Sequence, residues 1–264
     1  MWPFVLVAGV HAALALRTGA LSYEIPVAIG WTGVLLVYSE RARNQQPSRA
    51  SLFLGSLLAA AALGLAALWS GDYRAPLRLT PLLLGVGFLL ARHGTAFLRG
   101  SARELLLLSL PVAVPPPSGL RPFLEPQTAT IHATAALLGL IGHPASIDGE
   151  LLSVQGGAIR VISACSGINA MSQLAALALL VVCLFETTRL RKLAVFASAI
   201  AAGFFANCGR LALLAIISQR DHQAFELWHG TTGELRFTCL GLALASLAWW
   251  LLLRQRPVRA SQPA

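Results

Sequence analysis

The feature that most constrains this chain is a series of blocks in which apolar residues occupy every face of a helix. The blocks cover residues 2–16, 25–39, 51–70, 77–91, 104–114, 168–186, 193–217 and 237–253. Helices of soluble proteins keep their apolar residues in one stripe, so helices that are apolar all round favour a lipid environment. Because an open backbone cannot cross a bilayer, the blocks predict an all-α membrane protein with about eight transmembrane helices.

The charge of the chain fits the same class. Only 12% of its residues are charged, against about 25% in soluble domains. The net charge of +9 would also suit a nucleic-acid-binding protein. However, the basic residues flank the apolar blocks, as cations do at the cytoplasmic ends of spans. We therefore expect contact with membrane lipid and no nucleic acid.

The distribution of basic residues predicts the orientation. By the positive-inside rule, the segments richest in Arg and Lys are cytoplasmic. Four segments qualify, and they contain Arg41, Arg43 and Arg49; Arg92, Arg99 and Arg103; Arg189, Arg191 and Lys192; and Arg254, Arg256 and Arg259. The N-terminus has no basic region and no small-residue cleavage site, so the block 2–16 is interpreted as a span. Both termini are then inside a multi-pass protein of the cytoplasmic (inner) membrane.

This topology places residues 115–164 outside the cell. The stretch 128–141 has a helical pattern but is too short to cross, so it is predicted to lie along the interface. Residues 148–163 alternate polar and apolar, with Gly156 and Gly157 at the centre, which is typical of a β-hairpin. Three regions follow: an N-terminal transmembrane bundle (1–114), an extracytoplasmic insert (115–164) and a catalytic transmembrane region (165–264).

The first candidate for chemistry is Cys165, in the run Ser-Ala-Cys-Ser-Gly before the block 168–186. A cysteine at the N-terminus of a helix meets the positive end of the helix dipole, which favours the thiolate. Its small neighbours, Ser166 and Gly167 among them, are expected to leave the sulfur accessible. The structural alternative, a cysteine packed in a tight turn, is favoured when this motif is taken alone. The four cysteines show no disulfide framework and no metal-ligand spacing, and we predict no metal or cofactor.

The second candidate is Arg210, which shares a helix face with Asn207 inside the block 193–217. Placing a charged side chain within a span costs a few kcal/mol of insertion free energy, so such a residue is expected to have a structural or functional role. Pairing with an acid is the structural alternative. The neighbouring spans offer only Glu186, near the cytoplasmic end, so a functional role is favoured.

The third candidate is His229, in the segment 221–236 that returns the chain to the outer surface. A lone histidine in a loop is usually just solvated. Here a thiol, a guanidinium and an imidazole lie on one side of the membrane. The imidazole would move the thiol proton and the arginine would stabilise an oxyanion, as in a cysteine transpeptidase.

The chain resembles the exosortase/archaeosortase family of polytopic membrane transpeptidases. The resemblance rests on the runs VISACSGINAMSQL, ANCGRLALLAI and WHGTTGELRF, in that order, within residues 137–237. It implies that Cys165 is the nucleophile, Arg210 the catalytic arginine and His229 the catalytic histidine. Asn207 falls on the asparagine of the family's N-x-x-R motif and, with Ser166 and Gly167, is expected to bind substrate or support the site. One departure is Cys208-Gly209, where branched aliphatic residues are expected.

The resemblance also implies a substrate. Such enzymes recognise C-terminal sorting signals of secreted or surface proteins, made of a short motif such as Pro-Glu-Pro, a transmembrane helix and a basic tail. They cleave the signal through a thioacyl-enzyme. The alternative is a non-catalytic membrane protein that assists exopolysaccharide export or assembly. Thiol–disulfide exchange is disfavoured, because no second cysteine lies near Cys165 in the sequence.

Overall fold

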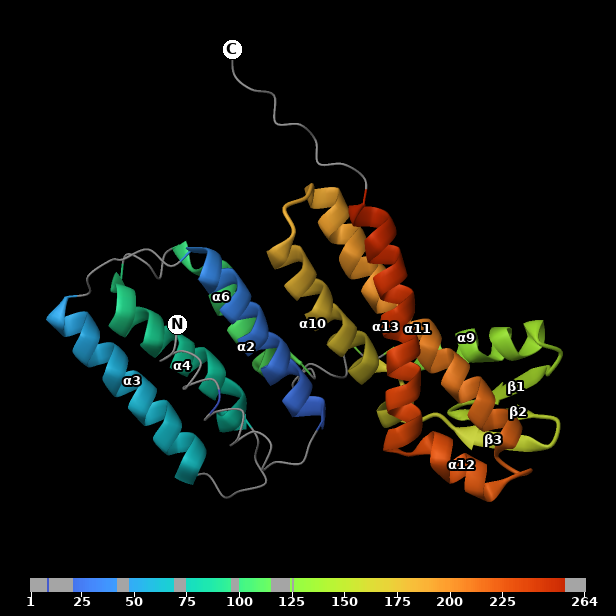
Figure 1. The fold of residues 1–264 in the computed structure, drawn as a ribbon. Coiled ribbons are helices and arrows are strands. Elements are labelled where there is room, and N and C mark those ends of the chain that lie inside the picture. Colours follow the sequence, from blue (N-terminus) through green and yellow to red (C-terminus); the bar gives the residue numbers. More distant parts are fainter. Residues whose placement is uncertain are drawn as a thin grey trace, which may run out of the picture. The chain divides into compact units, whose positions relative to one another are not determined.

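The computed structural model of the protein describes residues 21–41, 48–68, 75–95, 100–114 and 126–254, together with Gly9 and Leu124. The rest of the predicted span 2–16, the start of the predicted insert and the basic tail after Arg254 lie outside the described residues. The described part is mostly helical, with one small sheet (Figure 1). The chain divides into two compact units, Met1–Pro117 with Leu179–Glu186, and Ser118–Ala178 with Thr187–Ala264.

The helices of the first unit occupy the predicted apolar blocks. They are α2 (Leu21–Arg41), α3 (Arg49–Leu68), α4 (Ala75–His93), α6 (Ala102–Leu108) and α7 (Leu110–Ala113). Small residues bring these helices together: a Cβ atom on Gly55 of α3 would meet the backbone of Gly87 and Ala91 in α4. Similarly, a Cβ on Gly30 of α2 would lie 2.8 Å from the carbonyl oxygen of Leu107 in α6. Close backbone approach at small residues is the packing mode of membrane helices.

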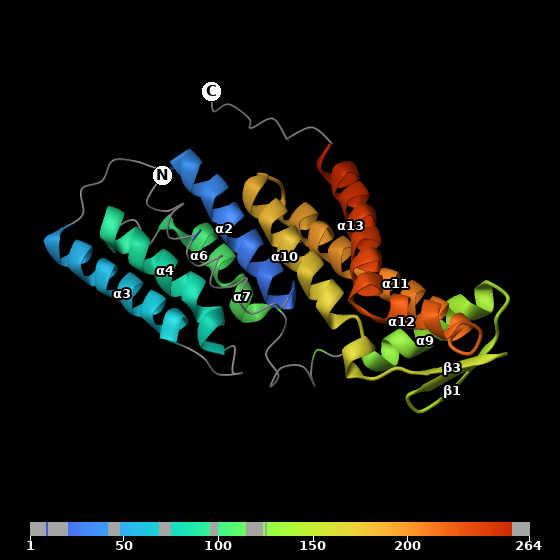
Figure 2. The same ribbon diagram turned by 60° about the horizontal axis from the view of Figure 1, so that its bottom comes forward.

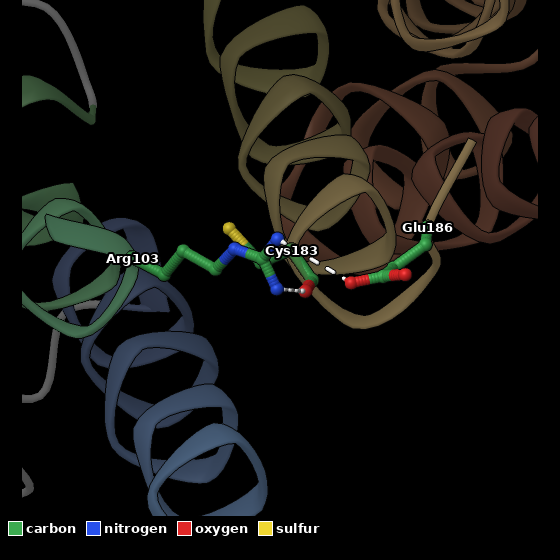
Figure 3. Close-up of polar contacts among 3 residues, drawn as sticks. All are labelled: Arg103, Cys183 and Glu186. Carbon is green, nitrogen blue, oxygen red and sulfur yellow. Dashed lines mark hydrogen bonds and ion pairs between the residues drawn. The ribbon is translucent and has the colours of Figure 1, made fainter. Parts of the chain in front are cut away.

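An ion pair joins the start of α6 to the end of α10 (Ile168–Leu184), whose last residues belong to this first unit. Arg103 lies 4.0 Å from the carboxylate of Glu186, and it donates a hydrogen bond of 3.5 Å to the carbonyl oxygen of Cys183 (Figure 3). Glu186 was the acidic residue that the sequence offered as a partner for Arg210. The structure pairs it with Arg103 instead, because the N-terminal end of α6 lies beside the C-terminal end of α10.

The second unit contains three antiparallel strands between two helices. After α9 (Gln127–Leu140) come β1 (Ala145–Asp148), β2 (Leu151–Val154) and β3 (Gly157–Arg160), paired in the order β1-β2-β3. The sequence predicted an all-α membrane protein whose insert contains one hairpin over residues 148–163. The structure instead has three strands, the first beginning at Ala145, and a turn at Gln155 and Gly156, where Gly156 has a φ of +81°.

Gly157 is the first residue of β3 and not part of the turn. A Cβ atom there would collide with the carbonyl oxygen of Ala215, and the neighbouring Ala158 N–H donates to Ser218 Oγ at 3.0 Å. The absence of a side chain at Gly157 therefore lets the sheet lie directly against the end of α11 (Arg189–Ile217).

Two described helices are long and apolar enough to cross a membrane: α11, with 29 residues, and α13 (Thr231–Leu253), with 23. Other apolar stretches in the described residues, such as Pro26–Val37, Arg49–Leu65 and Ile168–Leu184, are shorter. The number of eight spans therefore stays a prediction. The two long helices pack together, and Trp249 of α13 donates from its indole nitrogen to the carbonyl oxygen of Val195 at 3.0 Å.

Helix α11 is longer than a span requires. At about 1.5 Å per residue its 29 residues extend for about 44 Å, whereas the hydrocarbon core of a bilayer is about 30 Å thick. Its C-terminal end is surrounded by α9, the sheet and α12 (His222–His229), which we call the cap (Figures 1 and 2). An apolar cluster holds the cap on α11, and its buried members are Ile131, Leu138, Leu152, Ile159, Val161, Cys165, Leu211, Ala212, Leu214 and Ala215.

Candidate active site

Cys165 ends a short 3₁₀ turn, Ser163–Cys165, just before α10 begins at Ile168. The turn closes through a hydrogen bond of 2.8 Å from the Cys165 N–H to the carbonyl oxygen of Ile162. The side chain is 9% exposed and belongs to the apolar cluster under the cap. The expectation of an accessible sulfur was therefore wrong, because α9, the sheet and α11 converge on this turn.

Two side chains hold adjacent carbonyl groups of the cysteine turn. Asn207 of α11 donates from its amide nitrogen to the carbonyl oxygen of Cys165 at 2.9 Å. Thr130 of α9 donates its hydroxyl to the carbonyl oxygen of Ser166, also at 2.9 Å. Both donors are buried, as is Ser166. Because buried hydrogen bonds of this kind are costly to break, the turn is fixed between α9 and α11.

Gly167 completes the turn in a way that other residues would not allow. Its φ of +86° lies in the left-handed region, which disfavours residues with a side chain. A Cβ atom would also approach the side-chain atoms of Asn207 to 2.8–2.9 Å. Its carbonyl oxygen accepts the first helical hydrogen bond of α10, from the Met171 N–H at 3.0 Å. The glycine thus allows α10 to begin directly beside Asn207.

Arg210 lies one turn beyond Asn207 on α11 and is only 7% exposed. Its Nε atom is buried and has no hydrogen-bond partner, and Arg210 forms no ion pair with any residue that the structure describes. The guanidinium lines a pocket between α10, α11 and α13. The other lining residues are Ala164, Gly167, Asn169, Ala170, Ala206, Asn207, Glu234, Phe237 and Thr238.

The pocket adjoins the cysteine turn. Ala164 and Gly167, on either side of Cys165 in the sequence, are among its lining residues, whereas Cys165 is not. The N-terminal end of α10 also lines the pocket through Asn169 and Ala170. A helix N-terminus and a guanidinium both favour negative charge. These two groups are therefore suited to stabilising an oxyanion that develops next to the turn.

His229 is the last residue of α12, where the sequence suggested a loop. It is exposed, and its ring stacks on Phe225 with centroids 5.3 Å apart. Its neighbour Trp228 connects the helix to the rest of the site: it packs against the apolar cluster and makes an edge contact of 5.9 Å with Phe237 of the pocket. Helix α12 thus lies beside both the cluster that contains Cys165 and the pocket that contains Arg210.

The structure brings most of the predicted residues together. Hydrogen bonds or direct packing join Cys165, Ser166, Gly167 and Asn207, and Arg210 shares the pocket with Gly167 and Asn207. Among the described residues, no hydrogen bond, ion pair or ring contact joins His229 to Cys165 or to Arg210. Sequence reasoning missed Thr130, Asn169 and Glu234. The sequence did offer an indication of Glu234, because this residue lies with His229 in the run WHGTTGELRF that resembles the family.

Comparison with protein families gives one match. The model of a family described as transmembrane exosortase matches residues 18–249, which is most of the chain and includes every residue of the site. No curated protein and no solved structure matches the chain.

Proposed function

The chain belongs to the transmembrane exosortase family, and on that premise we propose that it is a membrane cysteine transpeptidase that cleaves the C-terminal sorting signals of surface proteins. Membrane transpeptidase activity and action on such signals are properties of the family. For this chain we assign the nucleophile to Cys165, the oxyanion-stabilising group to Arg210 and the general acid–base to His229. The signal we expect is a Pro-Glu-Pro-like motif followed by a transmembrane helix and a basic tail.

The observation that carries this proposal is the environment of Arg210. The Arg210 guanidinium is nine-tenths buried and its Nε has no partner. Burying such a group lowers the stability of the protein unless a ligand accepts a hydrogen bond from it. The pocket it lines is bounded by residues on both sides of Cys165. A carbonyl oxygen that becomes negative in a tetrahedral intermediate is the acceptor that such a donor would stabilise.

The chemical sequence follows from these assignments. His229 takes the thiol proton, and the Cys165 sulfur attacks the scissile carbonyl carbon. The C–N bond then breaks, the amine leaves with the proton from His229, and a thioacyl-enzyme remains. Since Cys165 packs among apolar side chains and His229 is exposed, both must rotate toward the pocket when substrate binds. For an exposed side chain such as His229, a change of rotamer is fast compared with catalysis.

We assign the site to the extracytoplasmic face of the cytoplasmic membrane. Helix α11 begins with Arg189, Arg191 and Lys192, and the site lies in its other half. The Arg103–Glu186 pair supports this orientation, because it brings together the start of α6 and the end of α10, and both lie in or next to segments rich in basic residues. In this arrangement the cap lies outside, α9 lies along the interface, and the chain has about eight spans with both termini inside.

The test is release of a C-terminal tag from a candidate substrate co-expressed with the protein. The substrate is a host protein that ends in a short motif, an apolar helix and a basic tail. We expect Cys165→Ala to abolish tag release and Cys239→Ala, in the exposed part of α13, to retain it. If Cys165→Ala releases the tag at the wild-type rate, the proposal fails. The protein would then be better described as a non-catalytic partner in export or assembly.

A further inference from the structure

The pocket beside Arg210 contains a second charged group, which no step above uses. Glu234 stands in the first turn of α13 and lines the pocket together with Asn169 of α10. Its carboxylate forms no hydrogen bond or ion pair with any described residue. The Oδ1 atom of Asn169 is buried and also lacks a partner. The pocket is therefore lined by a buried donor of Arg210 and a buried acceptor of Asn169 that both lack partners, and by the half-buried carboxylate of Glu234.

These groups define the chemistry of an occupant. Arg210 Nε requires a hydrogen-bond acceptor, preferably with negative charge, and Asn169 Oδ1 requires an N–H or O–H donor. The Glu234 carboxylate favours a donor with positive charge. An inorganic anion would satisfy Arg210 but would be repelled by Glu234. A group with an oxyanion and an amine nitrogen on one carbon atom satisfies both. The tetrahedral intermediate formed when an amine attacks a thioacyl group has this composition.

We propose that Glu234 and Asn169 form the amine-binding half of the site and select a primary amine as the acceptor. The inference rests on the proposed function and deepens it, because it favours transfer over hydrolysis. An ammonium group has three N–H donors, enough for the Glu234 carboxylate and for Asn169 Oδ1 together. Water carries no charge to attract the carboxylate, so it would enter the same position less favourably.

The transfer step balances with these groups. The entering ammonium gives one proton to the Glu234 carboxylate, and the nitrogen lone pair forms the C–N bond to the thioacyl carbon. The carbonyl electrons move to the oxygen beside Arg210 and then return as the C–S bond breaks. The second proton passes from nitrogen through His229 to the departing Cys165 thiolate. The products are an amide, a free thiol and a protonated Glu234, which returns its proton to water.

The experiment measures how the thioacyl-enzyme divides between two nucleophiles. The full-length protein in detergent, with the tagged substrate, receives equal concentrations of glycinamide and hydroxylamine at neutral pH. Glycinamide is then largely a charged primary amine, whereas hydroxylamine is largely neutral. Mass spectrometry of the new C-terminus gives the ratio of the two products, and this ratio is independent of how fast the thioacyl-enzyme forms.

We expect Glu234→Gln to lower the glycinamide-to-hydroxylamine ratio about tenfold, the effect of losing one charge-assisted hydrogen bond. Glu234→Asp, which keeps the charge, should give a ratio closer to that of the wild type. Glu226→Gln is the matched control, because Glu226 is an exposed acid of α12 that does not line the pocket. Size-exclusion elution checks that each variant is folded.

Three results would contradict the inference. An unchanged ratio in Glu234→Gln would show that the carboxylate does not select the amine. An equal decrease of the glycinamide-to-hydroxylamine ratio in Glu226→Gln would show that the effect comes from the general surface charge. Folded Glu234→Gln and Glu234→Asp proteins that form neither product would show that Glu234 serves the structure or the earlier cleavage step. A wild-type protein that forms neither product would contradict the proposed function itself.

Discussion

Gly167 shows how a single backbone position constrains the site. Its positive φ and its contact with Asn207 both exclude a side chain. We expect Gly167→Ala to destabilise the protein by about 1–2 kcal/mol from the left-handed conformation alone, and by more once Asn207 is displaced. The unfolding temperature in detergent and the rate of tag release should therefore both be lower than those of the wild type.

The matched control is Gly139→Ala, in α9, where a Cβ atom would meet nothing within 4 Å. Alanine stabilises a helix interior relative to glycine, so this variant should unfold at the same temperature as the wild type or slightly higher. If both alanine variants behave alike, the strained turn at Gly167 has no special importance.

The identity of the candidate residues could be predicted from the sequence, but their environments could not. Cys165, Asn207 and Arg210 were identified from residue type, spacing and family resemblance. The burial of Cys165 arises from α9 and the sheet, which approach it only in the folded chain. The pairing of Glu186 with Arg103, about eighty positions away in the sequence, depends on long-range packing in the same way.

Among the elements, α9 has a role in positioning the cysteine turn. Thr130 reaches the carbonyl oxygen of Ser166, and Thr134 donates to the carbonyl oxygen of Thr130 at 2.7 Å. Thr130→Val keeps the shape but leaves the Ser166 carbonyl without this donor, at a cost of about 1–3 kcal/mol. We expect slower tag release and a lower unfolding temperature, both measured on purified protein.

Thr128→Val provides the comparison on the same helix, because Thr128 is exposed, whereas Thr130 is buried. Thr128→Val should leave the rate of tag release and the unfolding temperature near their wild-type values. Equal effects of the two substitutions would mean that α9 matters only through its overall stability and does not position the cysteine turn.

The helices of this chain were more predictable than its sheet. Long apolar blocks identify helices regardless of their neighbours, and α2, α3, α4, α10, α11 and α13 lie on the predicted blocks. Strands of four residues carry little periodicity, so β1 was missed and the turn was shifted by one residue. Helix α12 was missed because its eight residues, started by the Asp221 side chain, look like a polar loop.

At the scale of the whole molecule, the main prediction is the side of the membrane on which the cap lies. Labelling of single cysteines with a membrane-impermeant thiol reagent in intact cells tests it. Asp148→Cys, exposed on β1, should be labelled, whereas Arg189→Cys, exposed at the start of α11, should be labelled only after the membrane is opened. The reverse pattern would place the site in the cytoplasm and contradict the positive-inside assignment.

The proposed mechanism requires Cys165 to form a thioacyl-enzyme with the cleaved substrate. The most direct measurement is to quench the working enzyme in acid, digest it and weigh the peptide that contains Cys165 by mass spectrometry. We expect this peptide to gain the mass of the substrate peptide that ends at the cleavage site, less one water, and we expect hydroxylamine to remove the added mass. Tag release from an active enzyme whose Cys165 peptide stays unmodified throughout turnover would contradict it.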